Sequence, residues 1–98
     1  MWDALARLRN DYLGDVPKET LLMKIAEEFG EAVEAYIGTT GQNPRKGVCR
    51  TKEDIRRELY DVIVTAGIAV LAWTGDDPEA TARGLEAHLA YLTGRAGV

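Results

Sequence analysis

Two short acidic clusters hold the residues of this chain that are best suited to chemistry. The first, EEFGE, contains Glu27, Glu28 and Glu31, and the second, ELYD, contains Glu58 and Asp61. Carboxylates three or four residues apart lie on one side of a helix, where like charges repel and destabilise the isolated helix. A hard divalent cation that binds oxygen ligands is the simplest means of offsetting this repulsion. The sequence therefore predicts a cation site built from two helices.

The types of ligand identify the cation. Carboxylates without a second histidine or a cysteine pair favour Mg²⁺, with Mn²⁺ as the other candidate, over zinc. A di-iron bundle needs a Glu-x-x-His motif on each of two helices, and His88 is the only histidine. EEFGE alone is typical of a solvated helix face. ELYD shifts the interpretation toward a metal site, because it leads directly into the apolar segment 62–73 and charged groups beside a buried segment need partners.

Four helices are predicted to position the two clusters. They are expected over about residues 2–13, 17–37, 52–73 and 78–92, separated by glycine- and proline-containing turns. The second helix is expected to end at Gly38, and the third to begin with a capping box formed by Thr51 and Asp54. The core face predicted for the second helix consists of Leu22, Ile25, Ala26, Phe29, Val33, Tyr36 and Ile37. The fold class is therefore all-α, a four-helix bundle-like single domain over residues 1–98.

Composition limits the partners and the compartment. The net charge is −4 without a basic stripe, so a nucleic-acid partner is not expected. The single cysteine, Cys49, and the lack of a signal peptide or of an apolar run long enough to cross a bilayer predict a cytoplasmic protein with no membrane partner. The segment 62–73 is apolar on every side, more than one small monomer buries, which predicts a homo-oligomer, either a homodimer or a homotetramer.

The loop between the acidic helices, residues 38–50, contains the densest basic stretch. Arg45, Lys46 and Arg50 lie in or at the end of this loop, close in sequence to both acidic helices. They are predicted to bind the phosphates of a substrate, although the loop lacks the order of a Walker A motif. The alternative is a solvated linker whose charges only aid solubility.

EEFGE, followed after 26 residues by ELYD, resembles the EExxE…ExxD signature of the MazG-like all-α nucleoside triphosphate pyrophosphohydrolases. The resemblance covers about residues 21–73. It implies Mg²⁺-dependent hydrolysis of a nucleoside triphosphate to a monophosphate and pyrophosphate, as in nucleotide-pool housecleaning, and assembly into dimers or tetramers. The positions that match the metal ligands of the family are Glu28, Glu31, Glu58 and Asp61.

The resemblance also suggests roles for two further residues. Glu27 matches a position that some members lack, and it is assigned a helper role such as water activation. Lys24 is expected to approach the phosphates or to neutralise the acidic cluster, with a simple i,i+4 pair to Glu28 as the alternative.

One departure from the family leaves a second interpretation open. Many members carry an Asn or Lys after the ExxD helix that holds the substrate, and the fourth helix here has neither. His88 or the basic loop could substitute. The rival function is a non-catalytic helical interaction module that binds metal or nucleotide without turnover, and a narrower rival is a phosphoribosyl-ATP or dUTP specialist.

Overall fold

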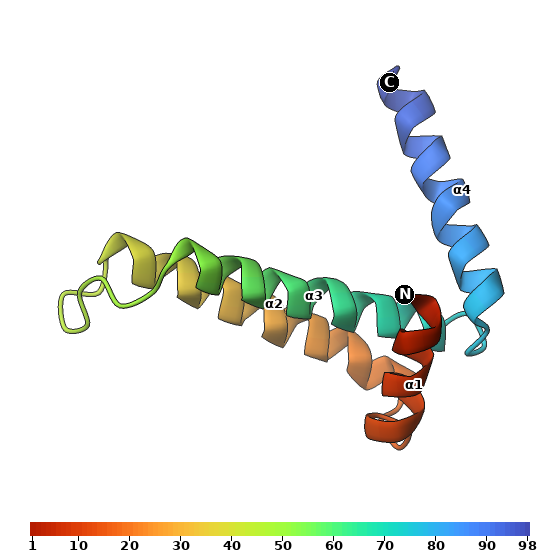
Figure 1. The fold of residues 1–98 in the computed structure, drawn as a ribbon, viewed down its shortest axis with the longest axis horizontal. Coiled ribbons are helices and arrows are strands. Elements are labelled where there is room, and N and C mark those ends of the chain that lie inside the picture. The colour runs from red at the N-terminus through yellow and green to blue at the C-terminus, as the bar shows by residue number, and fades with distance from the viewer. The chain divides into compact units, whose positions relative to one another are not determined.

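A computed structural model describes residues 1–98 and contains four α-helices and no strand. The helices are α1 (Trp2–Tyr12), α2 (Lys18–Thr40), α3 (Lys52–Ala72) and α4 (Pro78–Ala96), as labelled in Figure 1. The all-α prediction is confirmed. None of the four helices combines the length and the apolar character that crossing a bilayer requires.

The chain divides into two compact units. One unit, residues 16–66, contains α2, the basic loop and most of α3, and is called the hairpin unit below. The other combines residues 1–15 with residues 67–98. Both acidic clusters lie in the hairpin unit, so the candidate site can be described within it. A single domain over residues 1–98 stays a prediction.

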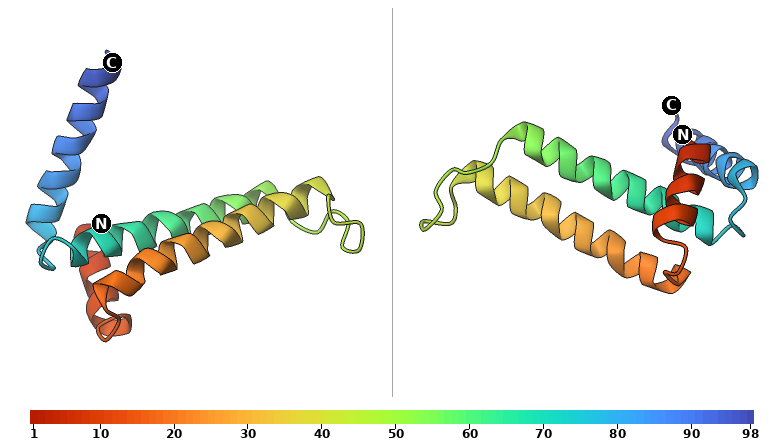
Figure 2. Two further views of the ribbon diagram at one scale, coloured as in Figure 1. Left: turned by 180° about the vertical axis from the view of Figure 1, so that it is seen from behind. Right: turned by 60° about the horizontal axis from the view of Figure 1, so that its bottom comes forward.

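In the hairpin unit, α2 and the part of α3 up to Ala66 run side by side in opposite directions (Figures 1 and 2). The buried residues of α2 are Leu21, Ala32, Ala35 and Gly38. They recur at intervals that keep them on one face of a helix. Three of the four are alanine or glycine, and such small side chains allow two helices to approach closely.

The core face predicted for α2 was wrong. Four of its large members are exposed, namely Leu22, Phe29, Val33 and Tyr36, and Ile25 and Ile37 are only half-buried. The prediction weighted side-chain size, whereas α2 buries the face with the smaller side chains. The larger apolar residues therefore form a separate, solvent-exposed stripe.

The ends of α2 also differ from the prediction. The helix continues through Gly38 and ends at Thr40, where Gly41 adopts a left-handed conformation with φ of 71°. Gly38 is a buried packing position instead of a helix terminus. Its carbonyl oxygen accepts hydrogen bonds from the backbone amides of Cys49 and Arg50, at 2.9 and 3.3 Å. The returning chain is thus joined to the last turns of α2.

The start of α3 agrees with the predicted capping box. The backbone amide of Asp54 donates to Oγ1 of Thr51 at 3.2 Å, and the backbone amide of Thr51 donates to Oδ2 of Asp54 at 2.9 Å. The hydrogen bonds that the backbone amide and the hydroxyl of Thr51 donate to the carboxylate of Asp54 hold the pKa of Asp54 below its usual value. The register of α3, and therefore the direction of Glu58, is set one turn before the site.

In the second unit, α1 contacts α4 and also approaches the end of α3. Leu5 is buried, and a Cβ added to Gly67 would lie 2.8 Å from its side chain. Arg9 forms an ion pair with Asp76 across 3.5 Å. The carboxylate of Asp77 accepts from the amide of Ala80 and caps α4, and α4 stays helical to Ala96, beyond its expected end.

Candidate metal centre

Two glutamates occupy the seam between α2 and α3. Glu28 follows the buried Leu21 by seven residues and precedes Ala32 and Ala35 by four and seven, so it shares their face of the helix. Glu28 and Glu58 are both half-buried. They are called the seam glutamates below. Glutamates are almost never fully buried unless they are paired, and these two are held partly out of water.

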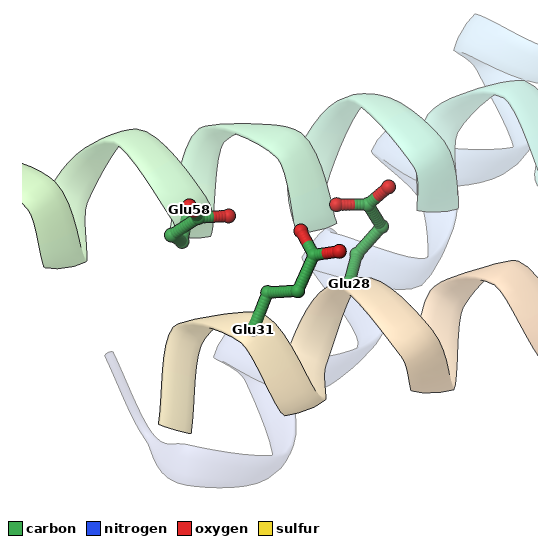
Figure 3. Close-up of side chains that lie close together, drawn as sticks. All are labelled: Glu28, Glu31 and Glu58. Carbon is green, nitrogen blue, oxygen red and sulfur yellow. The ribbon is translucent and has the colours of Figure 1, made fainter. Parts of the chain in front are cut away.

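Glu31 joins the seam glutamates in one cluster. Figure 3 shows Glu28 and Glu31 extending from α2 toward α3, which carries Glu58. One carboxylate oxygen from each of the three side chains lies within 4.8 Å of the other two. Residues 27 positions or more apart in sequence thus converge through the antiparallel pairing of the helices.

The surroundings of Glu58 disfavour its ionised form. Burial, followed by the negative charge of Glu31, a side-chain hydrogen bond with Glu31 and the negative charge of Asp61, raises the pKa of Glu58 above its usual value, against a smaller lowering by Arg50. Its Oε2 atom is buried and has no hydrogen-bond partner. A buried carboxylate oxygen without a donor is costly, and a cation is one partner that would satisfy it.

The donor set fits Mg²⁺ or Mn²⁺. The three converging side chains supply only carboxylate oxygens, which hard cations prefer, and no nitrogen or sulfur ligand accompanies them. Together with the unpartnered oxygen of Glu58, this supports the predicted metal centre. Glu28, Glu31 and Glu58 are the residues that would hold the ion.

Asp61 and Glu27, the remaining predicted acids, stand apart from this three-residue cluster. Asp61 is exposed one turn after Glu58 on α3, near enough for its charge to raise the pKa of Glu58. Glu27 is exposed on α2 and is not one of the converging residues. A ligand role for Asp61 and a helper role for Glu27 stay predictions.

Lys24 is half-buried on α2, one turn before Glu28. The two residues are spaced for an i,i+4 ion pair, but no such pair is formed. Lys24 therefore retains a free ammonium group on the same helix as the acidic cluster.

The basic loop contributes to a cavity of about 230 Å³ at the loop end of the hairpin. Lys46 and Arg50 both line it, whereas Arg45 does not. The backbone amide of Arg45 instead donates to the side chain of Asn43 at 3.0 Å. The full lining consists of Glu34, Ile37, Gly38, Asn43, Lys46, Gly47, Cys49 and Arg50.

Arg50 links this cavity to the carboxylates. It lines the cavity, and its positive charge also lowers the pKa of Glu58. On α2, Glu31, Glu34 and Gly38 follow one another at intervals of three and four residues, so cavity and cluster lie on the same side of that helix. A negatively charged ligand could contact a cluster-bound cation and the two basic side chains together.

Sequence reasoning missed three polar residues of the cavity: Glu34, Asn43 and Cys49. A signal for Glu34 was present, because it follows Glu31 by three residues on the same helix. Asn43 and Cys49 had no comparable signal, since their positions depend on how the loop returns over Gly38.

The fold and the site together define an all-helical chain with a three-carboxylate candidate cation centre beside a basic cavity. No protein-family model, no curated protein and no solved structure matches the chain. The assignment of a function therefore depends on the chemistry of the site and on the sequence signature.

Proposed function

We propose that this protein is a Mg²⁺-dependent nucleoside triphosphate pyrophosphohydrolase that releases a nucleoside monophosphate and pyrophosphate. The observation that supports it most strongly is the convergence of Glu28, Glu31 and Glu58, with ligand atoms within 4.8 Å of one another. The resemblance to the EExxE…ExxD signature supplies the reaction class. The geometry supplies a reason why these acids can act as one site.

The acidic cluster needs a cation before it can accept an anionic substrate. A triphosphate near neutral pH carries about four negative charges, and the bare carboxylates would repel it. A bound Mg²⁺ contributes charge screening for the phosphates and a lowered pKa for bound water. The carboxylates of Glu28, Glu31 and Glu58 would hold the ion, and Asp61 would add negative charge beside it.

The cavity supplies the second half of the proposed substrate site. Lys46 and Arg50 provide two positive charges in a volume of about 230 Å³, small for a complete nucleotide. Phosphate groups are the part of the substrate that both the charges and the volume suit. Arg50 also influences Glu58, so phosphates in the cavity would lie next to the cation centre.

Three predicted residues receive secondary roles in this proposal. Glu27 is exposed beside the cluster and serves as the helper that orients or activates water. Lys24, which has no ion pair with Glu28, lies on α2 on the side of the cluster away from the cavity, where its charge offsets part of the negative charge of the acids. Arg45 attracts the anion from solvent without lining the cavity.

The test is a screen of canonical, deoxy and modified nucleoside triphosphates for pyrophosphate release with Mg²⁺. Glu28→Gln and Glu58→Gln keep the shape of the side chains and remove the ligand charge, so each is expected to lower turnover at least about 100-fold, in the range seen when a group that stabilises the transition state is removed. Glu86→Gln, on an exposed turn of α4, changes the net charge equally and is expected to leave turnover unchanged.

The alternative is a module that binds metal or nucleotide without hydrolysis, and the fourth helix favours it because that helix lacks an Asn or Lys for substrate. His88 lies on an exposed face of α4 beside Tyr91, with ring centroids 5.9 Å apart. Metal binding without pyrophosphate release from any triphosphate would favour this module. Release of inorganic phosphate in place of pyrophosphate would refute cleavage between the α and β phosphates.

A further inference from the structure

Residues 43–47 of the basic loop form a tight turn that is held together by Asn43. Its main-chain oxygen accepts hydrogen bonds from the backbone amides of Lys46 and Gly47 at 3.1 and 2.9 Å. Its side-chain Oδ1 accepts from the backbone amide of Arg45 at 3.0 Å. Gly47 ends the turn in a left-handed conformation with φ of 62°, which glycine adopts without steric cost. The turn is therefore formed before any ligand binds.

These bonds leave the amide nitrogen of the Asn43 side chain free. Both oxygen atoms of Asn43 accept hydrogen bonds from within the turn. The bond from Arg45 also distinguishes the two ends of the side-chain amide, because the atom that faces a backbone N–H group must be the oxygen. Nδ2 therefore has two N–H donors that make no hydrogen bond. Since Asn43 lines the basic cavity, these donors are available to a ligand there.

Asn43 and Lys46 lie at the two ends of one β-turn. The hydrogen bond between the amide of Lys46 and the oxygen of Asn43 joins the first and fourth residues of this turn. The Cα atoms at these two positions are less than about 7 Å apart in a β-turn. Both residues line the cavity. One phosphate group, which has several acceptor oxygens, can therefore be contacted by both side chains.

The formal charges of the cavity favour an additional neutral donor. Lys46 and Arg50 contribute two positive charges and Glu34 contributes one negative charge, so the lining has a net charge of two minus one, or +1. Pyrophosphate and triphosphate groups carry more negative charge than this, and the carboxylate of Glu34 repels them. A hydrogen bond from a neutral amide to an anion adds affinity. Asn43 is the lining residue that has such an amide in its side chain.

We propose that Asn43 is a third phosphate-binding residue of the cavity, in which Nδ2 donates to an oxygen of the phosphate group that Lys46 contacts. The bonds within the turn order the amide in advance, so less conformational entropy is lost when the anion binds. The location of the phosphates in this cavity rests on the proposed function. The binding itself does not require hydrolysis, because inorganic pyrophosphate presents the same groups.

Asn43→Asp tests this donor. The substitution keeps an oxygen that can accept from the amide of Arg45, so the turn is retained, and it removes both N–H donors. Gln42→Glu is the matched control, because Gln42 is exposed on the same loop without lining the cavity and the substitution adds the same negative charge. The measurement is isothermal titration calorimetry of the full chain with inorganic pyrophosphate and Mg²⁺.

Asn43→Asp is expected to raise the dissociation constant of pyrophosphate at least about 10-fold, as the loss of a hydrogen bond to a charged group does. Gln42→Glu is expected to raise it less than about 3-fold, because a charge exposed to solvent acts weakly. Equal increases in the two variants would attribute the effect to charge alone and overturn the proposal. A wild-type chain that binds no pyrophosphate would also overturn it.

Hydrolysis assays separate this inference from the proposed function. If a triphosphate is hydrolysed, Asn43→Asp is expected to raise KM and to leave kcat largely unchanged, as the loss of uniform binding does, and an unchanged KM overturns the inference. If no triphosphate is hydrolysed, the proposed function fails. A loss of pyrophosphate binding in Asn43→Asp that Gln42→Glu does not share would then still support the phosphate site.

Discussion

Gly38 offers a direct test of how the basic loop is held beside the site. A Cβ added there would lie 2.8 Å from Cβ of Arg50 and 3.4 Å from Sγ of Cys49, and would also collide with Cγ of Arg50. The nearer atoms belong to the start of a side chain, so the backbone must move. That movement weakens two hydrogen bonds to the carbonyl of Gly38, at 2.9 and 3.3 Å. Gly38→Ala is therefore expected to displace the returning chain, including Arg50.

The magnitude follows from three contributions. Overpacking costs about 1–3 kcal/mol, and each weakened hydrogen bond costs up to about 1 kcal/mol. The helix propensity of alanine returns less than about 1 kcal/mol, because Gly38 is close to the end of α2. The net expectation is a loss of about 2–3 kcal/mol in the free energy of unfolding.

Gly30→Ala is the matched control within the same helix. Gly30 lies in the middle of α2, and a Cβ there would meet no atom within 4 Å. The substitution changes only the helix propensity at this position, so it is expected to raise the free energy of unfolding by about 0.5–1 kcal/mol.

Thermal unfolding at one fixed protein concentration compares the two variants. A difference of about 3 kcal/mol separates their midpoints by at least about 12 °C in a domain of this size. Equal midpoints for Gly38→Ala and Gly30→Ala would refute the contact between Gly38 and Arg50. They would also remove the reason for placing the basic cavity beside the carboxylates.

Further predictions concern the cation, the pH and the start of α3. Mg²⁺ at about 100 times its dissociation constant is expected to stabilise the protein by about 2.7 kcal/mol, and Glu28→Gln or Glu58→Gln should abolish the shift in melting temperature. A shift that persists in both variants would place the ion elsewhere. The raised pKa of Glu58 means that the folded state binds its proton more tightly than the unfolded state does. Without Mg²⁺, the contribution of Glu58 to stability should fall as the pH rises from the usual pKa of 4.5 through the raised one. In guanidinium unfolding with a chelator, the free energy of unfolding of Glu58→Gln should therefore rise relative to that of the wild type as the pH increases from about 4.5 to about 7.5. A difference that stays constant over this range would contradict the raised pKa. Thr51→Ala removes one acceptor of the capping box and should cost about 1 kcal/mol by the same measurement, whereas no loss would mean that the box does not stabilise α3.

Local signals in the sequence were sufficient to predict the number and type of the elements. Thr51 with Asp54, and Asp77 with Pro78, mark the starts of α3 and α4, because capping depends on residues within one turn. Gly38 shows the limit of such signals. A glycine at the end of an apolar stripe is typical of a helix terminus, but this one is buried against Arg50, a contact that involves residues twelve positions away.

The face of α2 that packs on α3 could not be predicted from residue size. Phe29 and Val33 form the stronger apolar stripe, and Leu21 and Ala32 form the weaker one, yet the weaker stripe is buried. The choice depends on how closely two helices can approach, which neither helix alone determines.

The acidic cluster could be predicted only in part, because it also depends on how α2 and α3 pair. Spacing alone places Glu28 and Glu31 on one side of α2, but only the antiparallel pairing with α3 brings Glu58 within 4.8 Å of them. The basic side chains depended on the fold of the loop, so Lys46 and Arg50 could not be separated from Arg45 in advance.

The position of the seam glutamates connects stability with function. An apolar side chain at position 28 would continue the buried series of Leu21, Ala32 and Ala35, whereas Glu28 brings a carboxylate into the seam beside Glu58. Burial and repulsion then disfavour the ionised form of Glu58, which is the form that a cation needs. Without a cation, the hairpin is consequently less stable than it would be with an apolar side chain at position 28. A cation bound at the proposed metal centre would relieve that repulsion, so the same residues that weaken the seam would couple the folding of the hairpin to binding of the ion.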